Sequence, residues 1–345
     1  MKKYLIEDKK YYKANLHCHS VKSDGAMTPE ELKSFFQKLG YSIVAFTDHT
    51  YIEDFNSYLS DESFIAINGY ENAIRKVDEN GVYNVFNSPV YHFCFFATDK
   101  NYVKLHGINE LDYTRWQNSK SIENRKELLA GGEFSPVTYD VSSINEMIKE
   151  ANENGFLVQY NHACWSLQSY EDYIGLKGLW SMEVYNHDCF LEGFNDFNEH
   201  VYDDMLKKGA TLCVTANDDN HSWMHIGGGF NYIGANELSY EGVIDAMKRK
   251  DIYASQAPTF EYIYIEDGKV YIKTSNVTKI SMISNNRKRA STRFDIDEEN
   301  MIVDYTRTGN TAVFEIPTDI KYLRFEIIDV NGKKAWTRAY FKDEL

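Results

Sequence analysis

The first residues with the chemistry of a metal site are two histidines near the N-terminus. His17 and His19 follow an apolar segment, residues 12–16, that we expect to form a strand. Because successive side chains of a strand point to opposite faces, both imidazoles lie on the same face. Asp24 follows in a turn and adds a carboxylate. Together these groups form a compact set of nitrogen and oxygen donors for a divalent ion.

The same arrangement recurs along the chain, where a histidine or a carboxylate follows the end of an apolar segment. Such residues come after segments 43–47, 64–68, 156–160 and 210–215, and one histidine opens the apolar run 91–98. In a barrel of parallel strands, residues distant in sequence meet at the rim where the strands end. These further donors are His49, Glu71, His92, His162, Asp219 and His221.

The type and number of the donors indicate which metals to expect. Imidazoles and carboxylates together favour zinc, iron or manganese over a thiolate-rich structural zinc site. Roughly nine donors exceed the coordination shell of one ion, so we expect two or three divalent ions. Clustered divalent ions activate water as hydroxide and stabilise an in-line displacement. The pattern therefore predicts a metal-dependent hydrolase.

The elements that must position these donors alternate between strands and helices. In addition to the six strand-like segments named above, a seventh spans residues 182–185. Helices are expected over residues 29–39, 142–154, 194–208 and 240–250. This alternation is typical of βαβ units in a mainly parallel sheet, which we expect to close as a barrel. A polar segment, 100–136, interrupts the pattern, and loops of that length tend to be lids or binding loops.

The composition divides the chain near residue 258. All ten histidines precede Gly227, and residues 259–345 show short alternating strand patterns instead. Asp267-Gly268 and Asn331-Gly332 are typical of β-hairpin turns. We therefore expect a hydrolase barrel over residues 1–258 and an accessory β-sandwich over residues 259–345. The sandwich could serve only for packing, or it could mediate an oligomer.

The charge distribution limits the classes of partner. The net charge of -15 arises entirely from residues 1–258, because residues 259–345 contain 14 Lys+Arg and 14 Asp+Glu. Such an acidic surface repels a polyanion and excludes duplex nucleic acid, whereas bound cations would let a small anionic substrate bind. Neither a membrane span nor a signal peptide is recognisable, so we expect no membrane and a cytoplasmic protein.

Several short motifs occur in a fixed order along the chain. They are His17-Cys18-His19-Ser20 with Ser23-Asp24-Gly25, then Phe46-Thr47-Asp48-His49, Gly69-Tyr70-Glu71, Tyr160-Asn161-His162 and Asp219-Asn220-His221. In these motifs, residues 12–258 resemble the polymerase and histidinol phosphatase (PHP) superfamily, in particular its bacterial members with a C-terminal β domain. The resemblance implies a distorted (β/α)₇ barrel and a metal-dependent phosphoesterase. The metal ligands that it implies are His17, His19, Asp24, His49, Glu71, His92, His162, Asp219 and His221.

One ligand has an alternative, since the closing motif contains two consecutive aspartates. Asp218 competes with Asp219, and the spacing to His221 favours Asp219.

Other residues are candidates for shaping the pocket. Asp48 could orient the neighbouring His49, and Glu183 and Asn186 end a strand near the site. Two arginines of the polar segment could bind a substrate phosphate, since a guanidinium binds phosphate through two hydrogen bonds; they are Arg115 and Arg125.

We expect hydrolysis of a small phosphomonoester or phosphodiester by a metal-activated hydroxide. Two alternatives stay open: the same site could cleave a carbamate or carboxylic ester, or the protein could be a catalytically idle binding protein. The full set of donors argues against idleness, because gathering so many polar groups in one place is costly without a function.

Overall fold

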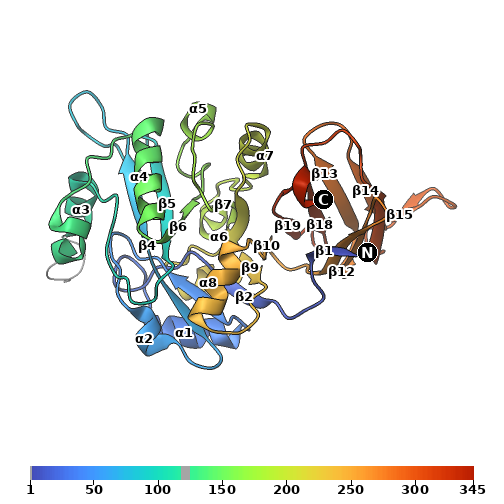
Figure 1. Cartoon of the computed structure of the whole chain (residues 1–345), viewed down its shortest axis with the longest axis horizontal. Helices are drawn as coiled ribbons and strands as arrows, with labels where there is room; N and C mark the ends of the chain where they lie inside the picture. The colour runs from blue at the N-terminus through green and yellow to red at the C-terminus, as the bar shows by residue number, and fades with distance from the viewer. Residues whose placement is uncertain (1, 118–124) are drawn as a thin grey trace.

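The computed structural model describes residues 2–117 and 125–345, which form an α/β region and an all-β region side by side (Figure 1). Both ends of the chain lie in the all-β region. The strands of the α/β region are β2 (Tyr12–Asn15), β3 (Ile43–Phe46), β4 (Ile65–Arg75), β5 (Val90–Ala97), β6 (Phe156–Tyr160), β7 (Ser181–Asn186), β8 (Cys213–Asn217), β9 (Phe230–Ile233) and β10 (Ile252–Ser255). Its helices are α1 (Pro29–Lys38), α2 (Phe55–Leu59), α3 (Glu110–Gln117), α4 (Val141–Glu153), α5 (Tyr170–Tyr173), α6 (His187–Leu191), α7 (Glu199–Lys207) and α8 (Tyr240–Lys248).

The α/β strands form one sheet in the order β10-β9-β2-β3-β4-β5-β6-β7-β8. Strands β2 to β4 are parallel, as are β6 to β8, but β5 is antiparallel to both of its neighbours. This reversal departs from the expected βαβ pattern because residues 76–89 contain no helix that could carry the chain back for a parallel pairing. As a result, His92 near the start of β5 lies at the edge where β4 and β6 end.

Two strands far apart in this order, β2 and β8, approach each other just beyond their ends. An isolated parallel bridge joins Cys18 and Asn220. The backbone N–H of Asp219 donates to the carbonyl of His17 at 3.1 Å, and that of Leu16 donates to Oδ1 of Asn217 at 3.0 Å. These contacts bring β8, the last strand in this order, against β2 without a continuous ladder among the described residues, so closure as a barrel stays a prediction.

The helices expected near residues 29, 142 and 240 are present. At α1, Thr28 Oγ1 accepts a hydrogen bond from the backbone N–H of Glu31, while the Glu31 carboxylate accepts one from the N–H of Thr28. This capping box satisfies two backbone donors that the first turn leaves free. The helix expected over 194–208 begins only at Glu199, because Phe197 forms an isolated bridge with Tyr185, and residues 194–198 are not helical.

The polar segment 100–136 contains α3 and a short 3₁₀ turn, η1 (Arg125–Leu128). Residues 118–124 of this segment lie outside the described residues. Among the described helices, none combines the length and apolar character that spanning a membrane requires.

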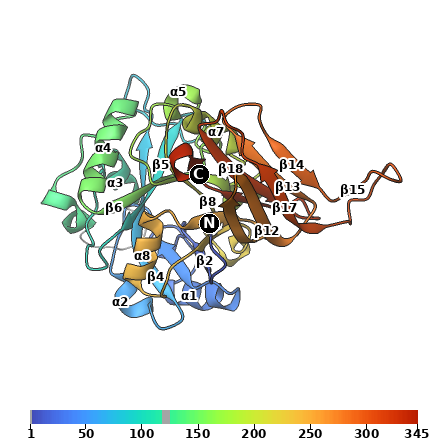
Figure 2. The ribbon, with the colours of Figure 1, turned by 45° about the vertical axis from the view of Figure 1, so that its right-hand side comes forward.

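The all-β region contains two sheets that share one apolar core, together with a separate pair of short strands, Ile296–Asp297 and Ile302–Val303. One sheet has the order β1-β11-β12-β17; the other, β14-β13-β18-β19, continues through β10 into the α/β sheet. Figure 2 shows this region turned toward the viewer, and both expected hairpin turns are confirmed, between β11 and β12 and between β18 and β19. The strands are β1 (Lys3–Ile6), β11 (Phe260–Glu266), β12 (Lys269–Val277), β13 (Lys279–Ser284), β14 (Ala290–Arg293), β15 (Ile296–Asp297), β16 (Ile302–Val303), β17 (Gly309–Glu315), β18 (Tyr322–Ile328), β19 (Lys334–Thr337) and β20 (Tyr340–Phe341).

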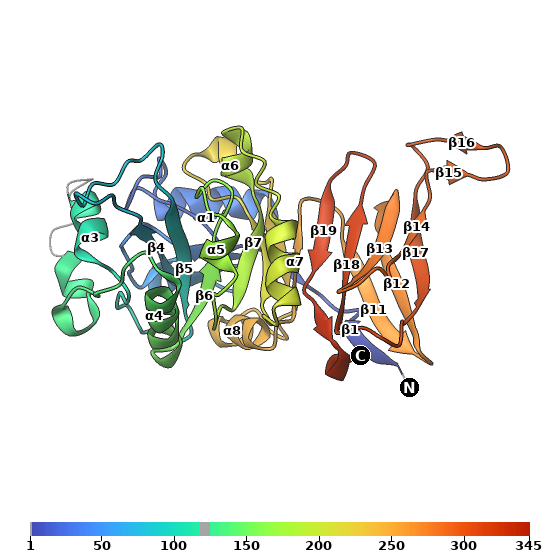
Figure 3. The ribbon, with the colours of Figure 1, turned by 90° about the horizontal axis from the view of Figure 1, so that it is seen from above.

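The two regions are joined by more than the chain that connects them. Helix α7 faces the all-β region, as seen from above in Figure 3. The buried Arg324 guanidinium donates from Nε to Asp203 of α7 at 2.9 Å. Lys334 and Trp336 both donate to the carboxylate of Glu199, at 2.6 and 3.2 Å.

Candidate metal centre

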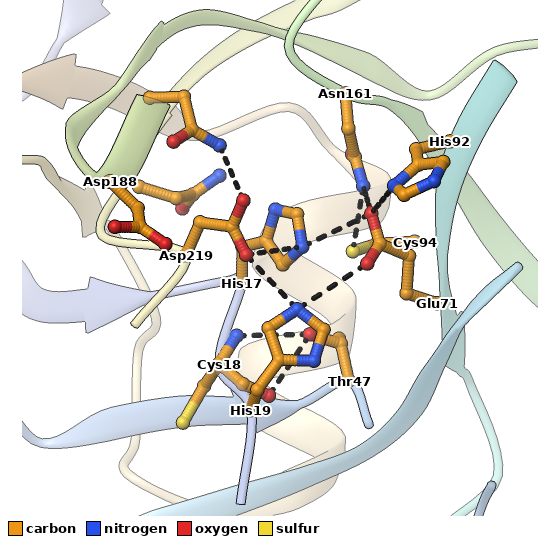
Figure 4. A network of polar contacts seen from close by, with 12 residues as sticks. His17, Cys18, His19, Thr47, Glu71, His92, Cys94, Asn161, Asp188 and Asp219 are labelled. Carbon is orange, nitrogen blue, oxygen red and sulfur yellow. Dashed lines mark hydrogen bonds and ion pairs between the residues drawn. The ribbon is translucent and has the colours of Figure 1, made fainter. Parts of the chain in front are cut away.

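Glu71 lies in the middle of β4, fully buried, and its carboxylate is surrounded by imidazoles (Figure 4). This position follows from the length of β4, which continues past the point where β3 ends. Each surrounding imidazole places one nitrogen within 3.4 Å of a carboxylate oxygen. The imidazoles belong to His17, His19, His49, His92 and His162.

Asp219 supplies a second carboxylate on the same side as Glu71. Its Oδ1 lies 3.1 Å from Nε2 of His17 and 3.0 Å from Nε2 of His19. The backbone of Asp219 is left-handed, with φ at 52°, a conformation that non-glycine residues adopt at a cost and that turns the side chain inward.

Asp218 has a different role from its neighbour. Its Oδ1 accepts hydrogen bonds from the backbone N–H groups of Gly228 and Gly229, and its Oδ2 accepts one from the hydroxyl of Tyr41. The carboxylate of Asp218 thus points away from the histidines, so the geometry supports Asp219 as the ligand of the pair.

Asp24 supplies a third carboxylate, on the exposed side of the cluster. Its Oδ2 lies 3.6 Å from Nε2 of His49 and 3.5 Å from Nε2 of His221, and its Oδ1 lies 3.7 Å from Nδ1 of His19. These distances exceed hydrogen-bonding lengths, and they leave room for an ion between the side chains.

Asp48 holds the turn that carries Asp24. Its carboxylate accepts hydrogen bonds from the backbone N–H and hydroxyl of Ser20, at 2.7 and 2.8 Å, and from the hydroxyl of Ser23 at 2.8 Å. Although Asp48 precedes His49 in sequence, the structure shows its carboxylate bonded to this turn. Its contribution to the site is therefore to fix the position of Asp24.

The charges in this cluster depend on each other. Burial raises the pKa of Glu71, but the surrounding imidazoles outweigh it and hold the pKa well below its usual range. Burial lowers the pKa of His17, but Asp219 and the other acidic groups outweigh it and hold the pKa well above its usual range. The field that attracts protons to this histidine would also attract divalent cations.

Several buried donor atoms have no hydrogen bond within the described part of the chain. These atoms are Nε2 of His17, Nε2 of His19, Nδ1 of His49 and Oδ1 of Asp219. A buried polar atom without a hydrogen bond is costly, and metal coordination would remove that cost. The donor set therefore fits a cluster of divalent ions.

The donors form overlapping groups, in each of which the ligand atoms lie within 4.8 Å of one another. All nine ligands expected from the sequence belong to these groups. The groups are His17 with His19 and Glu71; His17 with His162 and Asp219; Glu71 with His92 and His162; His19 with Asp24, His49 and His221; and His221 with Asp188 and His225.

Glu183 at the end of β7 orients one of these histidines. Its carboxylate accepts a hydrogen bond from Nδ1 of His17 at 2.8 Å, which leaves Nε2 of that ring for a metal. The same carboxylate accepts hydrogen bonds from the side chains of Asn217 and Asn186, at 2.9 and 3.0 Å. Asn186 also donates to Oδ2 of Asp219 at 3.0 Å, so it links the two carboxylates.

Two residues near the site, Asp188 and His225, were not predicted from the sequence. Asp188 in α6 lies 2.8 Å from Nδ1 of His221 through one oxygen, and 2.8 Å from Nδ1 of His225 through the other. The sequence signal for Asp188 was the same as for the other donors, because it is a carboxylate that closely follows the end of a strand, here β7. The adjacent His187 instead forms a hydrogen bond through Nδ1 with the hydroxyl of Tyr185.

The donors lie at one side of a cavity of about 350 Å³, here called the metal cavity. Arg75, Arg115, Trp116 and Trp165 form other parts of its wall. The Trp116 ring stacks on His49 with centroids 4.3 Å apart. Arg75 forms an ion pair with Asp112.

The two arginines expected to bind phosphate differ in position. Arg115 is exposed and lines the metal cavity. Arg125 is buried outside this lining, and its guanidinium donates to the backbone carbonyls of His49 and Lys22, at 3.0 and 2.7 Å. Of the two, only Arg115 is positioned to contact a ligand in the cavity.

Solved structures to which this chain shows similarity include a two-domain protein from Bacteroides vulgatus that contains a predicted PHP-like metal-dependent phosphoesterase, at 13% identity, with 98% of each chain covered and a TM-score of 0.44. An amidohydrolase from Chromobacterium violaceum matches at 15% identity over 61% of this chain and 87% of that one, with a TM-score of 0.36. A lesion-specific endonuclease from Pyrococcus furiosus matches at 17% identity over 69% and 56%, with a TM-score of 0.40. A search of curated proteins finds no match.

The family comparison covers the whole metal centre. The sequence profile of the PHP domain matches residues 15–255, a span that begins just before His17 and extends beyond His221. The nine clustered donors all fall within it. The chain therefore belongs to the PHP domain family.

Proposed function

We propose that this protein is a metal-dependent phosphoesterase that hydrolyses a small phosphomonoester or phosphodiester. The observation that carries the proposal is the set of nine clustered donors beside the metal cavity. Two or three ions of zinc, iron or manganese would be held there by His17, His19, Asp24, His49, Glu71, His92, His162, Asp219 and His221. Such ions would activate a water molecule and neutralise charge on the phosphoryl oxygens.

The residues around the ligands fix their geometry. Glu183 holds His17 through Nδ1, and Asp188 holds His221 in the same way, so each ring presents Nε2 toward the cluster. Asn186 keeps the carboxylates of Glu183 and Asp219 at a fixed separation. Positions fixed in this way lower the cost of arranging the reacting groups.

The protein alone is a poor site for an anion. Asp24, Glu71 and Asp219 bring negative charge to the cluster, and Arg115 is at the wall of the cavity rather than among the ligands. Bound divalent ions would reverse the local sign of the potential. We therefore expect phosphate to bind only after the metals, with Arg115 contacting its outer oxygens.

The test measures hydrolysis of p-nitrophenyl phosphate, bis(p-nitrophenyl) phosphate and p-nitrophenyl acetate by purified protein loaded separately with Mn²⁺, Zn²⁺ or Fe²⁺. We expect hydrolysis of at least one phosphoester, with little or none in the His17→Ala variant. If no phosphoester is cleaved by the metal-loaded protein and the variant behaves identically, the proposal is wrong. Cleavage of the acetate alone would instead favour the carboxylic-ester or carbamate hydrolase.

We further propose that residues 259–345 stabilise the hydrolase region of residues 1–258. Strand β1 pairs with β11, β10 pairs with β19, and the buried Arg324 depends on Asp203. Removing residues 259–345 would expose these edges and leave Asp203 without its partner. We expect insoluble protein, whereas a soluble and fully active fragment would favour a role in oligomer formation.

A further inference from the structure

A second cavity of about 340 Å³ adjoins the metal cavity and is here called the side cavity. The two cavities share part of their walls: Tyr83, Val85, Trp165 and Glu192 line both. A ligand with one end at the metal donors could therefore extend past Trp165 into the side cavity.

The rest of the side-cavity wall is mainly apolar. It includes Phe86, Val90, Leu167 and Phe194, and several of these side chains are open to solvent, with 85% of Phe86 and 44% of Leu167 exposed. Large apolar side chains gathered at a concave surface are typical of a ligand site. Covering them with an apolar group would release water and contribute favourably to binding.

Among the described residues that line the side cavity, Glu192 is the one that carries a charge at neutral pH. Its carboxylate accepts a hydrogen bond from Nε1 of Trp165 at 2.8 Å, which holds it at the shared wall. Its negative charge would repel an anionic group there, whereas Arg115 lines the metal cavity only. The charges therefore separate an anion-binding end from an apolar end.

The backbone connects the two cavities directly. His162 is followed by a turn in which the N–H of Ser166 donates to the carbonyl of His162 at 3.1 Å, and the N–H of Leu167 donates to that of Cys164 at 3.1 Å. Leu167 has a left-handed backbone, with φ at 56°. Such a conformation is costly for a leucine, and here it accompanies an apolar side chain held at the mouth of a cavity.

We propose that the side cavity binds the leaving group of the substrate and that this group is an uncharged, apolar alcohol or phenol. This inference rests on the proposed phosphoesterase function. The phosphoryl group would lie at the metal donors, and the ester oxygen would point toward Trp165. Substrates whose leaving group carries a further phosphate or carboxylate would be disfavoured by Glu192.

The test compares three phosphomonoesters: phenyl, p-tert-butylphenyl and p-carboxyphenyl phosphate. For the metal-loaded protein we expect kcat/KM to rise by about tenfold from phenyl to p-tert-butylphenyl phosphate, because the added alkyl group is buried. We expect p-carboxyphenyl phosphate to be the poorest substrate. Equal kcat/KM values for all three would overturn the inference while leaving the phosphoesterase function intact.

Three variants locate the effect. Leu167→Asn introduces a residue that tolerates the left-handed backbone but removes the apolar contact. It should erase most of the preference for p-tert-butylphenyl phosphate. Glu192→Gln should selectively improve p-carboxyphenyl phosphate. The matched control is Phe190→Ser, an exposed apolar residue that lines neither cavity, and it should retain the wild-type preference.

Binding without turnover separates this inference from the proposed reaction. Calorimetric titration of the metal-loaded protein with phenylphosphonate and p-tert-butylphenylphosphonate should show tighter binding of the second, with the difference lost in Leu167→Asn. If that result came with no phosphoester hydrolysis, the side cavity would stand and the proposed reaction would fail. Equal affinities together with active hydrolysis would support the proposed reaction and contradict the role of the side cavity.

Discussion

Glu71 and Phe325 are both fully buried, with 1% and 0% of their surfaces exposed, but their surroundings have little in common. Phe325 in β18 belongs to an apolar core with side chains such as Ile263 and Ile280, each of which stabilises the fold by leaving water. Glu71 is surrounded by imidazoles that are themselves buried, and each of these groups is tolerable only because the others are present.

The difference shows how stability and function are distributed in this protein. Apolar contacts in the all-β region can be lost one at a time, with a cost that depends on the volume removed. The polar cluster of the α/β region is a coupled network, so replacing one member changes the charge and geometry of the rest. A molecule with both regions can keep a costly site because its stability comes from elsewhere.

The largest expected effect is that of Glu71→Gln. The substitution keeps the size of the side chain but removes the charge that the surrounding imidazoles share. We expect loss of bound metal, measured by mass spectrometry of the purified protein, and loss of phosphoesterase activity to the detection limit. Glu315→Gln, at an exposed position of strand β17 in the all-β region, is the control and should retain both. Wild-type metal content and activity in Glu71→Gln would contradict the coupling described for this cluster.

Phe325→Ala should have the opposite profile. Removing a buried aromatic side chain should lower the free energy of unfolding by about 3–5 kcal/mol, measured by denaturant titration. Activity per folded molecule and metal affinity should stay unchanged, because Phe325 is not in the cluster. Val313→Ala, at an exposed position of β17, should cost far less. A metal-affinity defect in Phe325→Ala would show that the two regions are less separate than the comparison implies.

Glu183→Gln tests the residues that orient the ligands. The glutamine would weaken the hydrogen bond from Nδ1 of His17, so its Nε2 would no longer be held toward the cluster. Metal affinity should fall by roughly 10–100-fold with the fold intact, measured by competition with a fluorescent chelator. Glu146→Gln, exposed on α4, is the matched control. A change smaller than about twofold would argue against an orienting role.

The smallest effect concerns pH and metal removal. In the metal-free protein, burial and the neighbouring His221 lower the pKa of His19, but the nearby carboxylates of Asp219 and Glu71 outweigh them and raise it to about 9. Because the folded pKa lies above the unfolded value near 6.5, protonated His19 contributes stability that is fully present below about pH 6.5. This contribution is lost as the pH rises through about 9.

The chelator-treated protein should therefore melt at a lower temperature at pH 9 than at pH 6.5, as followed by calorimetry. The metal-loaded protein should lose less stability over this range, since bound cations replace the protons. A metal-free protein whose melting temperature rises over the same range would contradict the raised pKa of His19.

Much of the fold followed from local patterns. The capping residues around Pro29 and the turns at Asp267-Gly268 and Asn331-Gly332 have strong local preferences, and the structure contains these elements where they were expected. The reversed β5 and the late start of α7 were not predictable in this way. They depend on pairing with β4, β6 and β7, which are distant contacts that no short window of sequence encodes.

For the site, the sequence by itself determined which donors exist and that they follow strand ends, because the alternation of apolar strands and polar termini is a local property. The tertiary structure decided which way the side chains point. Asp219 faces the histidines and Asp218 faces away because the backbone at Asp219 is left-handed and Gly228 and Gly229 bind its neighbour. Arg115 lines the cavity, whereas the guanidinium of Arg125 donates to backbone carbonyl groups. The reason is the same, because side-chain direction is set by contacts across the fold and not by position in the chain.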